Sequence, residues 1–200
     1  VTTGIRVQVP FGNREVEGLV IERVGVPAIT NGLKSITKVL SPHPVATTKS
    51  LELIVQCAQR WATNPWDVLR SAIPPRVAAV DKAFIPSESK SPRFNNQADS
   101  SFRAFEPHVS PHAQVALIAR EAGRKGTVLI VAPDERDILA ILAQLDGVTS
   151  PVLRIDSGVS RNERYQNFLN AMESTNQIVI GSRNSVFTPL APGSTIIVFK

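Results

Sequence analysis

The sequence has little cysteine and no long hydrophobic run. Cys57 is the only cysteine in 200 residues, which excludes an internal disulfide and a metal site built from several thiolates. No apolar stretch approaches the roughly 20 residues of a membrane-spanning helix. The first ten residues alternate in polarity instead of forming a signal-peptide core. We therefore expect a cytoplasmic protein that is neither secreted nor bound to a membrane.

What the sequence does contain is enough apolar material for a core and an excess of positive charge. Hydrophobic residues make up 42% of the chain and charged residues 20%, which excludes a disordered tail and a collagen-like repeat. The net charge is +5, and residues 1–77 hold nine basic and five acidic side chains. A basic N-terminal segment favours a polyanionic partner such as nucleic acid. An ordinary solvated surface explains the charge equally well.

Residues 1–77 have the pattern of a small β-rich module that ends in two helices. Alternating polarity and turn residues predict three strands, at residues 5–9, 16–24 and 36–40. An amphipathic helix is predicted over residues 48–62. A shorter helix is expected to begin at Pro65, with Asn64 as its N-cap. The predicted fold class of this module is α+β.

The rest of the chain divides into a linker and an α/β lobe. Residues 78–111 contain four prolines and little periodicity, which is typical of a linker. In residues 112–200, short continuous apolar runs predict buried strands at 127–132, 152–155, 177–181 and 195–199. Helices are predicted over 114–123, 134–145 and 160–172. This alternation predicts a parallel sheet.

Polar residues follow three of the predicted strands, at Pro133-Asp134, Asp156-Ser157-Gly158 and Gly181-Ser182-Arg183. Ligands of open parallel sheets bind beyond the carboxyl ends of the strands, so these turns are suited to a nucleotide or a nucleic acid. Ordinary α/β turns account for the same pattern.

A phosphate-binding loop is missing. The motif G-x-x-x-x-G-K-[ST] must follow a strand and open a helix, whereas the nearest candidate, residues 123–127, has the wrong spacing and precedes a strand. The acidic magnesium-binding pair expected after a later strand is missing too, because the sequence stops at Lys200. We therefore predict no ATP hydrolysis, no bound cofactor and no catalytic residue in this chain.

The histidines, the cysteine and the tryptophans are predicted to have structural roles. His108 and His112 are four residues apart, but the prolines beside them argue against a helix that would align them on a metal ion. We predict linker histidines and no metal site. Cys57, Trp61 and Trp66 are predicted to pack in the core or between subdomains. Base stacking is the alternative for the two tryptophans.

The turn after the first strand is the candidate nucleic-acid contact. Phe11 lies at its tip, between Arg6 and Arg14 on neighbouring strands. An exposed aromatic ring there would stack a base while the arginines hold phosphates, and a buried Phe11 that anchors the turn is the alternative. Lys34 and Lys38 precede or lie on the next strand. If the strands form a meander, these cations line one side of a groove.

Three stretches carry a family resemblance. Residues 4–14 read GIRVQVPFGNR and are followed by Gly18 and Val20, residues 157–164 contain SGVS and ER, and residues 178–190 read IVIGSRNSVFTPL. They resemble, in the same order, the G-x-R-V-x-V-P-F-G-x-R, S-G-L-S…E-R and I-V-I-G-T-R-S-A-x-F-A-P-L motifs of PriA (primosomal protein N′), a family of replication-restart helicases. The resemblance covers nearly the whole chain and is weakest in the linker.

The resemblance implies a DNA-binding module in residues 1–77 and the first RecA-like helicase lobe in residues 112–200. In that family the module recognises the 3′ end of a nascent strand at a stalled fork, and the lobe couples hydrolysis of ATP with magnesium to unwinding. Gly181, Ser182 and Arg183 match a segment that faces the DNA backbone. The implied partners are branched or fork DNA, replication or primosome proteins and single-strand-binding protein, in a nucleoid-associated setting.

The sequence also departs from the family. The Phe-Asp-Tyr strand that precedes the first motif is absent, the linker is too short for the winged-helix domain, and the zinc site is not in this fragment. With the missing phosphate loop, the combination is similar to actinobacterial PriA-like proteins that lack ATPase motifs. We expect a fragment, truncated at both ends, that binds DNA in primosome assembly without ATPase or helicase activity. The alternatives are an active ATP-dependent DNA helicase whose ATP-site residues lie elsewhere and a non-catalytic scaffold that binds replication proteins.

Overall fold

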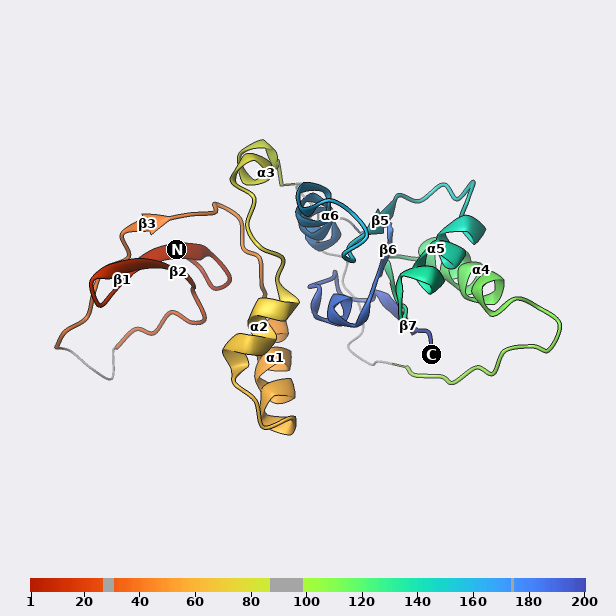
Figure 1. The fold of residues 1–200 in the computed structure, drawn as a ribbon, viewed down its shortest axis with the longest axis horizontal. Helices are drawn as coiled ribbons and strands as arrows, with labels where there is room; N and C mark the ends of the chain where they lie inside the picture. The colour runs from red at the N-terminus through yellow and green to blue at the C-terminus, as the bar shows by residue number, and fades with distance from the viewer. Residues whose placement is uncertain (27–30, 87–98, 174) are drawn as a thin grey trace. The chain divides into compact units, whose positions relative to one another are not determined.

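The N-terminal sheet is built on a tight hairpin. In the computed structural model, which describes residues 1–26, 31–86, 99–173 and 175–200, the strands β1 (Arg6–Phe11) and β2 (Arg14–Leu19) pair antiparallel (Figure 1). Phe11 lies opposite Arg14, so the connecting turn contains only Gly12 and Asn13. Gly12 has a φ of 59° and Asn13 a negative φ, the combination of a type II′ turn.

A third strand, β3 (Lys38–Val39), adds to the other side of β1, which gives the sheet order β2-β1-β3. Among the described residues, β3 pairs with β1 only at Val7 and Gln8. The outer half of β1, including Pro10, therefore has no described strand on that side. β2 ends at Leu19, earlier than the predicted strand over 16–24. The reason is that Leu19 pairs with Arg6, where β1 begins, and Val20 bonds Gly4 and Ile5 just before β1, so the described residues after Val20 have no part of β1 left to pair with.

Gly4 determines the path of the backbone that leads into β1. Its φ is 84°, and a Cβ at this position would overlap the backbone carbonyl of Ala46. Its N–H donates to the Val20 carbonyl at 2.7 Å, and its carbonyl accepts from the Val45 N–H at 2.8 Å. A residue with a side chain fits neither the left-handed backbone nor the space.

Two helices follow as predicted. α1 (Thr48–Arg60) is capped by Thr47 and Ser50, and α2 (Pro65–Ala72) begins with the Asn64 side chain accepting a hydrogen bond from the Trp66 N–H at 2.9 Å. The two helices pack against each other through buried apolar side chains, namely Leu51, Ile54, Ala58, Val68, Leu69 and Ala72. The helix predictions for 48–62 and from Pro65 are thus confirmed.

A third helix, α3 (Ala78–Ala83), lies where the linker was predicted to begin. It is tied back by buried Asp81, which accepts from Ser41 Oγ at 3.2 Å and from Arg76 Nε at 2.6 Å. Phe84 is also buried and meets His43 edge to face at 5.0 Å. The first compact unit therefore ends at Phe84 and not at residue 77. We call Val1–Phe84 the N-terminal unit and Ile85–Lys200 the C-terminal unit.

The C-terminal unit contains the predicted parallel sheet. Its elements are α4 (Pro111–Gly123), β4 (Val128–Val131), α5 (Glu135–Gln144), β5 (Val152–Arg154), α6 (Arg161–Glu173), β6 (Ile178–Gly181), a 3-10 helix η1 (Arg183–Phe187) and β7 (Thr195–Val198). The strand order is β5-β6-β4-β7, and all three pairings are parallel. α4 begins at Pro111, three residues before the predicted helix, and includes His112, so His112 is not a linker residue.

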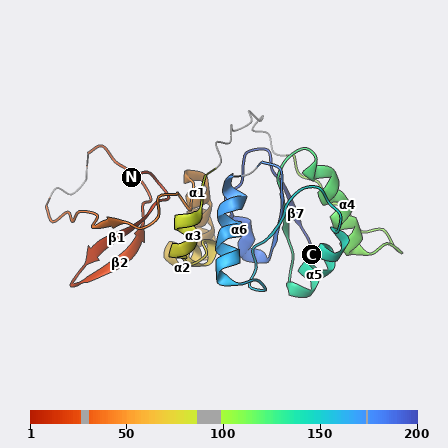
Figure 2. The same cartoon turned by 90° about the horizontal axis from the view of Figure 1, so that it is seen from above.

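Helices cover both faces of this sheet. α4 and α5 pack on one face around Ile130 and Ile180, and α6 covers the other face, over Leu129 and Val179 (Figure 2). Every residue of β4 and β6 is buried, as the continuous apolar runs predicted. The mixed fold expected from the sequence, an antiparallel sheet followed by a parallel one, is confirmed. In the described part of the chain, no helix has the length and hydropathy of a membrane-spanning segment.

Candidate nucleic-acid interface

The tip of the β1–β2 hairpin exposes an aromatic ring beside a cation. The Phe11 side chain is 75% exposed, so the interpretation of Phe11 as a buried turn anchor is wrong. Arg14 is exposed and lies directly opposite Phe11 in the sheet register. Residues opposite each other in an antiparallel pair project from the same face. Phe11 and Arg14 therefore project from one face of the hairpin.

The same face of the sheet is otherwise apolar. By the alternation of strand side chains, it holds buried Val7 at its inner end and, nearer the surface, Val9, its partner Val16, and Val39 of β3. Val16 and Val39 are 37% and 45% exposed. We call Val9, Val16 and Val39 together with Phe11 and Arg14 the hairpin surface. It is an exposed apolar surface with one cation at its end.

Arg6 lies on the opposite face and is already engaged. Its guanidinium donates to the Pro74 carbonyl at 2.6 Å and forms an ion pair with Glu17. The Arg6 side chain is only 11% exposed. The prediction that Arg6 and Arg14 line the same groove is therefore wrong. Arg6 holds the sheet to the segment after α2.

The lysines do not join Arg14 either. Lys38 lies opposite Gln8, which places it on the face that carries Glu15 and Glu17. Lys34 is exposed in the segment before β3. The structure thus brings together Phe11 and Arg14 and separates them from Arg6 and Lys38. The register of the hairpin would have revealed this separation from the sequence, because a two-residue turn at Gly12-Asn13 fixes which strand residues share a face.

In the C-terminal unit, the three predicted polar clusters lie together at the carboxyl ends of the strands, because all four strands are parallel. Gly181 ends β6 and is buried, since a Cβ there would lie 2.8 Å from Ser185 Cβ and 2.9 Å from Ile155 Cγ1. Ser182 is half-buried at the start of η1, and its carbonyl accepts from Ser185 Oγ at 2.6 Å. Arg183 is exposed. Of the three predicted contact residues, only Arg183 presents a charged side chain to solvent.

A charged network joins two of the clusters. Arg154 donates to both carboxylate oxygens of Asp156, at 2.5 and 2.9 Å, and to Glu135 at 2.7 Å. The Gly158 N–H also donates to Asp156, at 2.8 Å. A Cβ at Gly158 would overlap the Arg154 guanidinium. This network holds the β5–α6 loop to the start of α5.

The network shifts two pKa values. Burial of Asp156 raises its pKa, but hydrogen bonds from Arg154 and the Gly158 N–H, with the Arg154 charge, outweigh burial and leave the pKa below 3.8. Hydrogen bonding to Asp156 and Glu135 raises the pKa of Arg154. Both groups are charged at neutral pH, and their charges neutralise each other. The sequence analysis did not single out Arg154, although Arg154-x-Asp156 at a strand end was a usable signal.

His112, in the first turn of α4, contacts other side chains of the C-terminal unit. His112 Nε2 lies 2.8 Å from Asp137 Oδ1 in the first turn of α5. The His112 ring is 5.3 Å from the Phe199 ring, which also meets Phe105 at 5.5 Å. In the described ranges, no cluster of three or more potential ligand side chains is placed to hold a metal ion.

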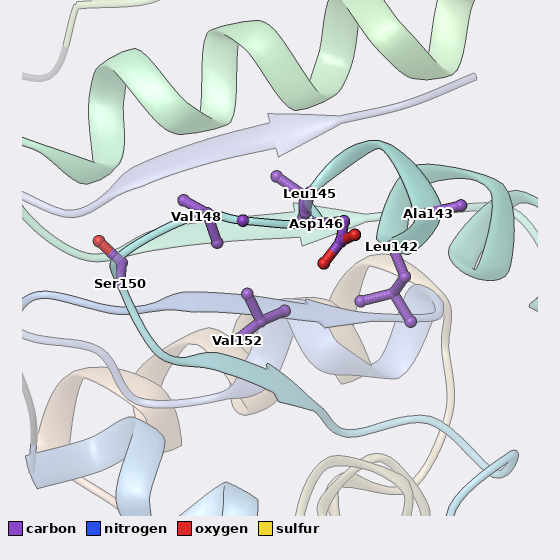
Figure 3. A pocket seen from close by; sticks show the side chains of 8 residues that line it. Leu142, Ala143, Leu145, Asp146, Val148, Ser150 and Val152 are labelled. Carbon is purple, nitrogen blue, oxygen red and sulfur yellow. The ribbon is translucent and has the colours of Figure 1, made fainter.

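A pocket of about 620 Å³ lies at the amino ends of the strands, between the end of α5 and the start of β5. Figure 3 shows its lining side chains, which include Leu142, Leu145, Val148 and Val152 with Asp146 and Ser150. Because ligands of parallel sheets bind at the carboxyl ends of the strands, this pocket does not coincide with the candidate interface.

The tryptophans are not buried. Trp61 is 65% exposed and Trp66 is 47% exposed, so the prediction that both pack in the core is wrong for these side chains. The amphipathic pattern of α1 and α2 is complete without them. Cys57 on α1 is half-buried.

Known proteins are similar to this chain in sequence. Residues 1–74 match the family model of the PriA 3′DNA-binding domain (3′BD). The chain is 29% identical to the probable replication restart protein PriA of Mycobacterium tuberculosis (strain H37Rv), over 98% of this chain and 34% of that protein. It is 28% identical to the Mycobacterium leprae (strain TN) protein with the same name and the same coverage. The chain spans about a third of the length of these relatives. The predicted resemblance to PriA is confirmed.

Proposed function

We propose that this chain binds DNA at or near a 3′ end through the hairpin surface and acts in replication restart without hydrolysing ATP. One observation supports this above the others. Residues 1–74, which match a 3′DNA-binding domain, carry an exposed Phe11 beside Arg14 on an open sheet face. The unit is also basic, with ten basic and six acidic side chains in residues 1–84, which favours a polyanion.

The hairpin surface offers two kinds of contact. The Phe11 ring stacks on a base, which contributes about 1–3 kcal/mol per base. Arg14 holds a phosphate and positions the strand without reading its sequence. Val9 and Val16 offer further apolar area to a nucleotide stacked on the face.

For the C-terminal unit we propose a RecA-like lobe whose Gly181, Ser182 and Arg183 segment contacts the DNA backbone. The lobe does not hydrolyse ATP, because its sequence contains no G-x-x-x-x-G-K-[ST] phosphate-binding loop. Fork DNA, primosome proteins and single-strand-binding protein are the proposed partners of the whole protein, in the bacterial cytoplasm.

Fluorescence anisotropy with labelled DNA tests the proposal. We expect the full chain to bind a duplex with an accessible 3′ end, more weakly as salt rises. Phe11→Ala should lose affinity worth about 1–3 kcal/mol, and Arg14→Glu should lower the salt slope by about one unit or more. Lys125→Glu, the same charge change at the far edge of the C-terminal sheet, serves as the control and should bind like the parent.

Two results would contradict the proposal. Absence of salt-dependent DNA binding would favour the non-catalytic scaffold, and DNA-stimulated phosphate release from ATP would favour an active helicase. Equal losses in Lys125→Glu and Arg14→Glu would show that net charge, and not the hairpin surface, carries the binding.

A further inference from the structure

Both tryptophans of the chain lie at one turn. Trp61 follows the last residue of α1, and Trp66 is the second residue of α2. The sequence contains no other tryptophan. Their side chains are 65% and 47% exposed, which is unusual for the largest apolar side chain. We call residues 61–66 the tryptophan turn.

The backbone of the tryptophan turn is held on both sides. The Thr63 N–H donates to the Ala58 carbonyl at 3.0 Å, and the Ala62 N–H donates to the Gln59 carbonyl at 3.3 Å. These two bonds form the Schellman motif that closes a helix. On the other side, Asn64 caps α2 through its bond to the Trp66 N–H. The two indoles therefore project from a fixed backbone.

Ala62 shows that this turn is built at a cost. Its φ is 49°, one of two positive φ values of non-glycine residues in the described part of the chain. A left-handed residue with a side chain costs about 1–2 kcal/mol. The Schellman motif requires this conformation of the residue after the C-cap, so it fixes the direction in which the chain leaves α1.

The core under the turn is already closed. Leu51, Ile54 and Ala58 of α1 are buried against α2. Neither indole is needed to complete that contact, so their exposure leaves two large aromatic surfaces to contact a partner.

The charged neighbours favour a polyanion. Arg60, next to Trp61, and Arg70, in the last turn of α2, are both exposed. Asp67, next to Trp66, is the acidic side chain of the turn region, and Glu52 lies nine residues before Trp61. Arg70 lies one helical turn after Trp66 on α2, and exposed indoles with arginines nearby in the fold are suited to stacking bases while the arginines hold phosphates.

We propose that the tryptophan turn is a base-stacking platform for single-stranded DNA, separate from the hairpin surface. Trp61 and Trp66 stack on bases, and Arg60 and Arg70 contact the phosphates that flank them. The platform rests on the proposed DNA-binding function and extends it from the contacted end to the adjoining single strand. Both indoles lie within residues 1–74, the part that matches a DNA-binding domain.

Intrinsic fluorescence of the full chain tests the platform directly, because all indole emission comes from this turn. Titration with oligodeoxythymidylate should quench the emission, since a stacked base quenches an indole. Trp61→Phe and Trp66→Phe each leave one indole, so each variant reports on one position while keeping a ring that stacks.

Affinity is measured in parallel by anisotropy of labelled oligodeoxythymidylate. The double variant Trp61→Leu/Trp66→Leu removes the stacking of two bases and should lose about thirtyfold or more in affinity, whereas the double phenylalanine variant should retain most of it. Leu117→Ala, which shortens an exposed leucine on α4, is the control and should bind like the parent. Far-UV circular dichroism checks that each variant is folded.

The outcomes separate this proposal from the proposed function. If the parent chain binds DNA but its emission does not change and the double leucine variant binds equally well, the platform is overturned and the turn is assigned to a protein contact. If the parent chain does not bind any DNA, the proposed function itself is overturned. Quenching with loss of affinity in the leucine variant supports both.

Discussion

The two sheets of this protein use their strands in opposite ways. β4 and β6 of the C-terminal unit bury all four of their residues. β1 and β2 of the N-terminal unit bury only Val7 completely, and the rest are half-buried or exposed. A parallel sheet covered on both faces leaves only its strand ends for recognition, whereas an open antiparallel sheet can offer its strand side chains themselves.

This difference explains where the candidate contacts lie. In the C-terminal unit they are loop residues, such as Arg183, at the carboxyl ends of the strands. In the N-terminal unit Phe11 and Arg14 are strand residues. Recognition on a strand depends on register, and recognition at a strand end depends on how the loops are held.

The largest expected effect is on the loops of the C-terminal unit. Asp156→Asn removes a buried carboxylate that bonds Arg154 and the Gly158 N–H, leaves Arg154 with Glu135 as its charged partner, and should destabilise this unit by about 3 kcal/mol at neutral pH. Chemical denaturation followed by far-UV circular dichroism measures the loss. Tryptophan emission, which reports only on the N-terminal unit, should keep its midpoint, because the two units are separately compact. A shift in both signals would contradict the separation.

The same variant has a signature in pH. The folded pKa of Asp156 lies below its ordinary value of 3.8. Its stabilisation is therefore complete above that ordinary value and is lost as the pH falls through the lower folded pKa. The difference between the parent and Asp156→Asn should be constant near neutrality and shrink in acid. Glu121→Gln, an exposed acid on α4, is the control and should show no such convergence.

The second-largest effect is expected in the N-terminal unit. Gly4→Ala forces a side chain into a left-handed backbone against the Ala46 carbonyl and should cost the N-terminal unit about 2 kcal/mol or more. The midpoint of the tryptophan emission should move while the C-terminal transition stays. Gly25→Ala, at a position with open space, should change little. An unchanged emission midpoint in Gly4→Ala would mean that the stability of the N-terminal sheet does not depend on the backbone conformation of Gly4.

A smaller effect tests the strain at the tryptophan turn. Ala62→Gly removes the side chain from a left-handed residue at the end of α1 and should stabilise the N-terminal unit by about 1 kcal/mol. Ala62→Val should destabilise it instead. Thermal melts monitored by tryptophan emission measure both. A loss of stability in Ala62→Gly would show that the positive φ carries no strain.

The smallest effect compares the two DNA contacts. Arg183→Ala removes an exposed cation from a strand end and should weaken DNA binding by less than about 1 kcal/mol, lowering the salt slope by about one unit. Arg14→Ala, on a strand, should show the same slope change in the same anisotropy titration. If Arg183→Ala leaves affinity and slope unchanged, Arg183 has a structural role and the contacts are confined to the N-terminal unit.

Elements were predictable from the sequence where local signals were strong. The continuous apolar runs gave β4 and β6 almost to the residue, and the Asn64-Pro65 pair marked the start of α2. α3 was missed because six residues carry no periodicity, and because Asp81 is held by side chains outside the helix, Arg76 in the segment before it and Ser41, 40 residues earlier.

Side-chain placement was harder to predict than the elements. Assigning Arg6 and Arg14 to one groove needed the register, which follows only when the turn is known to contain two residues. Trp61 and Trp66 were predicted to pack in the core or between subdomains because they flank a helix junction, but smaller side chains of α1 and α2 already fill the contact between these two helices. Tertiary contacts decided both cases, and a single sequence does not show them.

Pro10 protects the protein from associating through its own open sheet. The carbonyls of Arg6 and Gln8 accept hydrogen bonds from the Leu40 and Thr37 N–H groups, so the even-numbered positions of β1 face the β3 side. Pro10 is the next such position, beyond the pairs that β3 forms. An unpaired strand edge is a template for the strand of another molecule, and proline removes the N–H that an incoming strand would need. Through this one residue, the apolar hairpin surface stays exposed while the strand edge beside it resists aggregation.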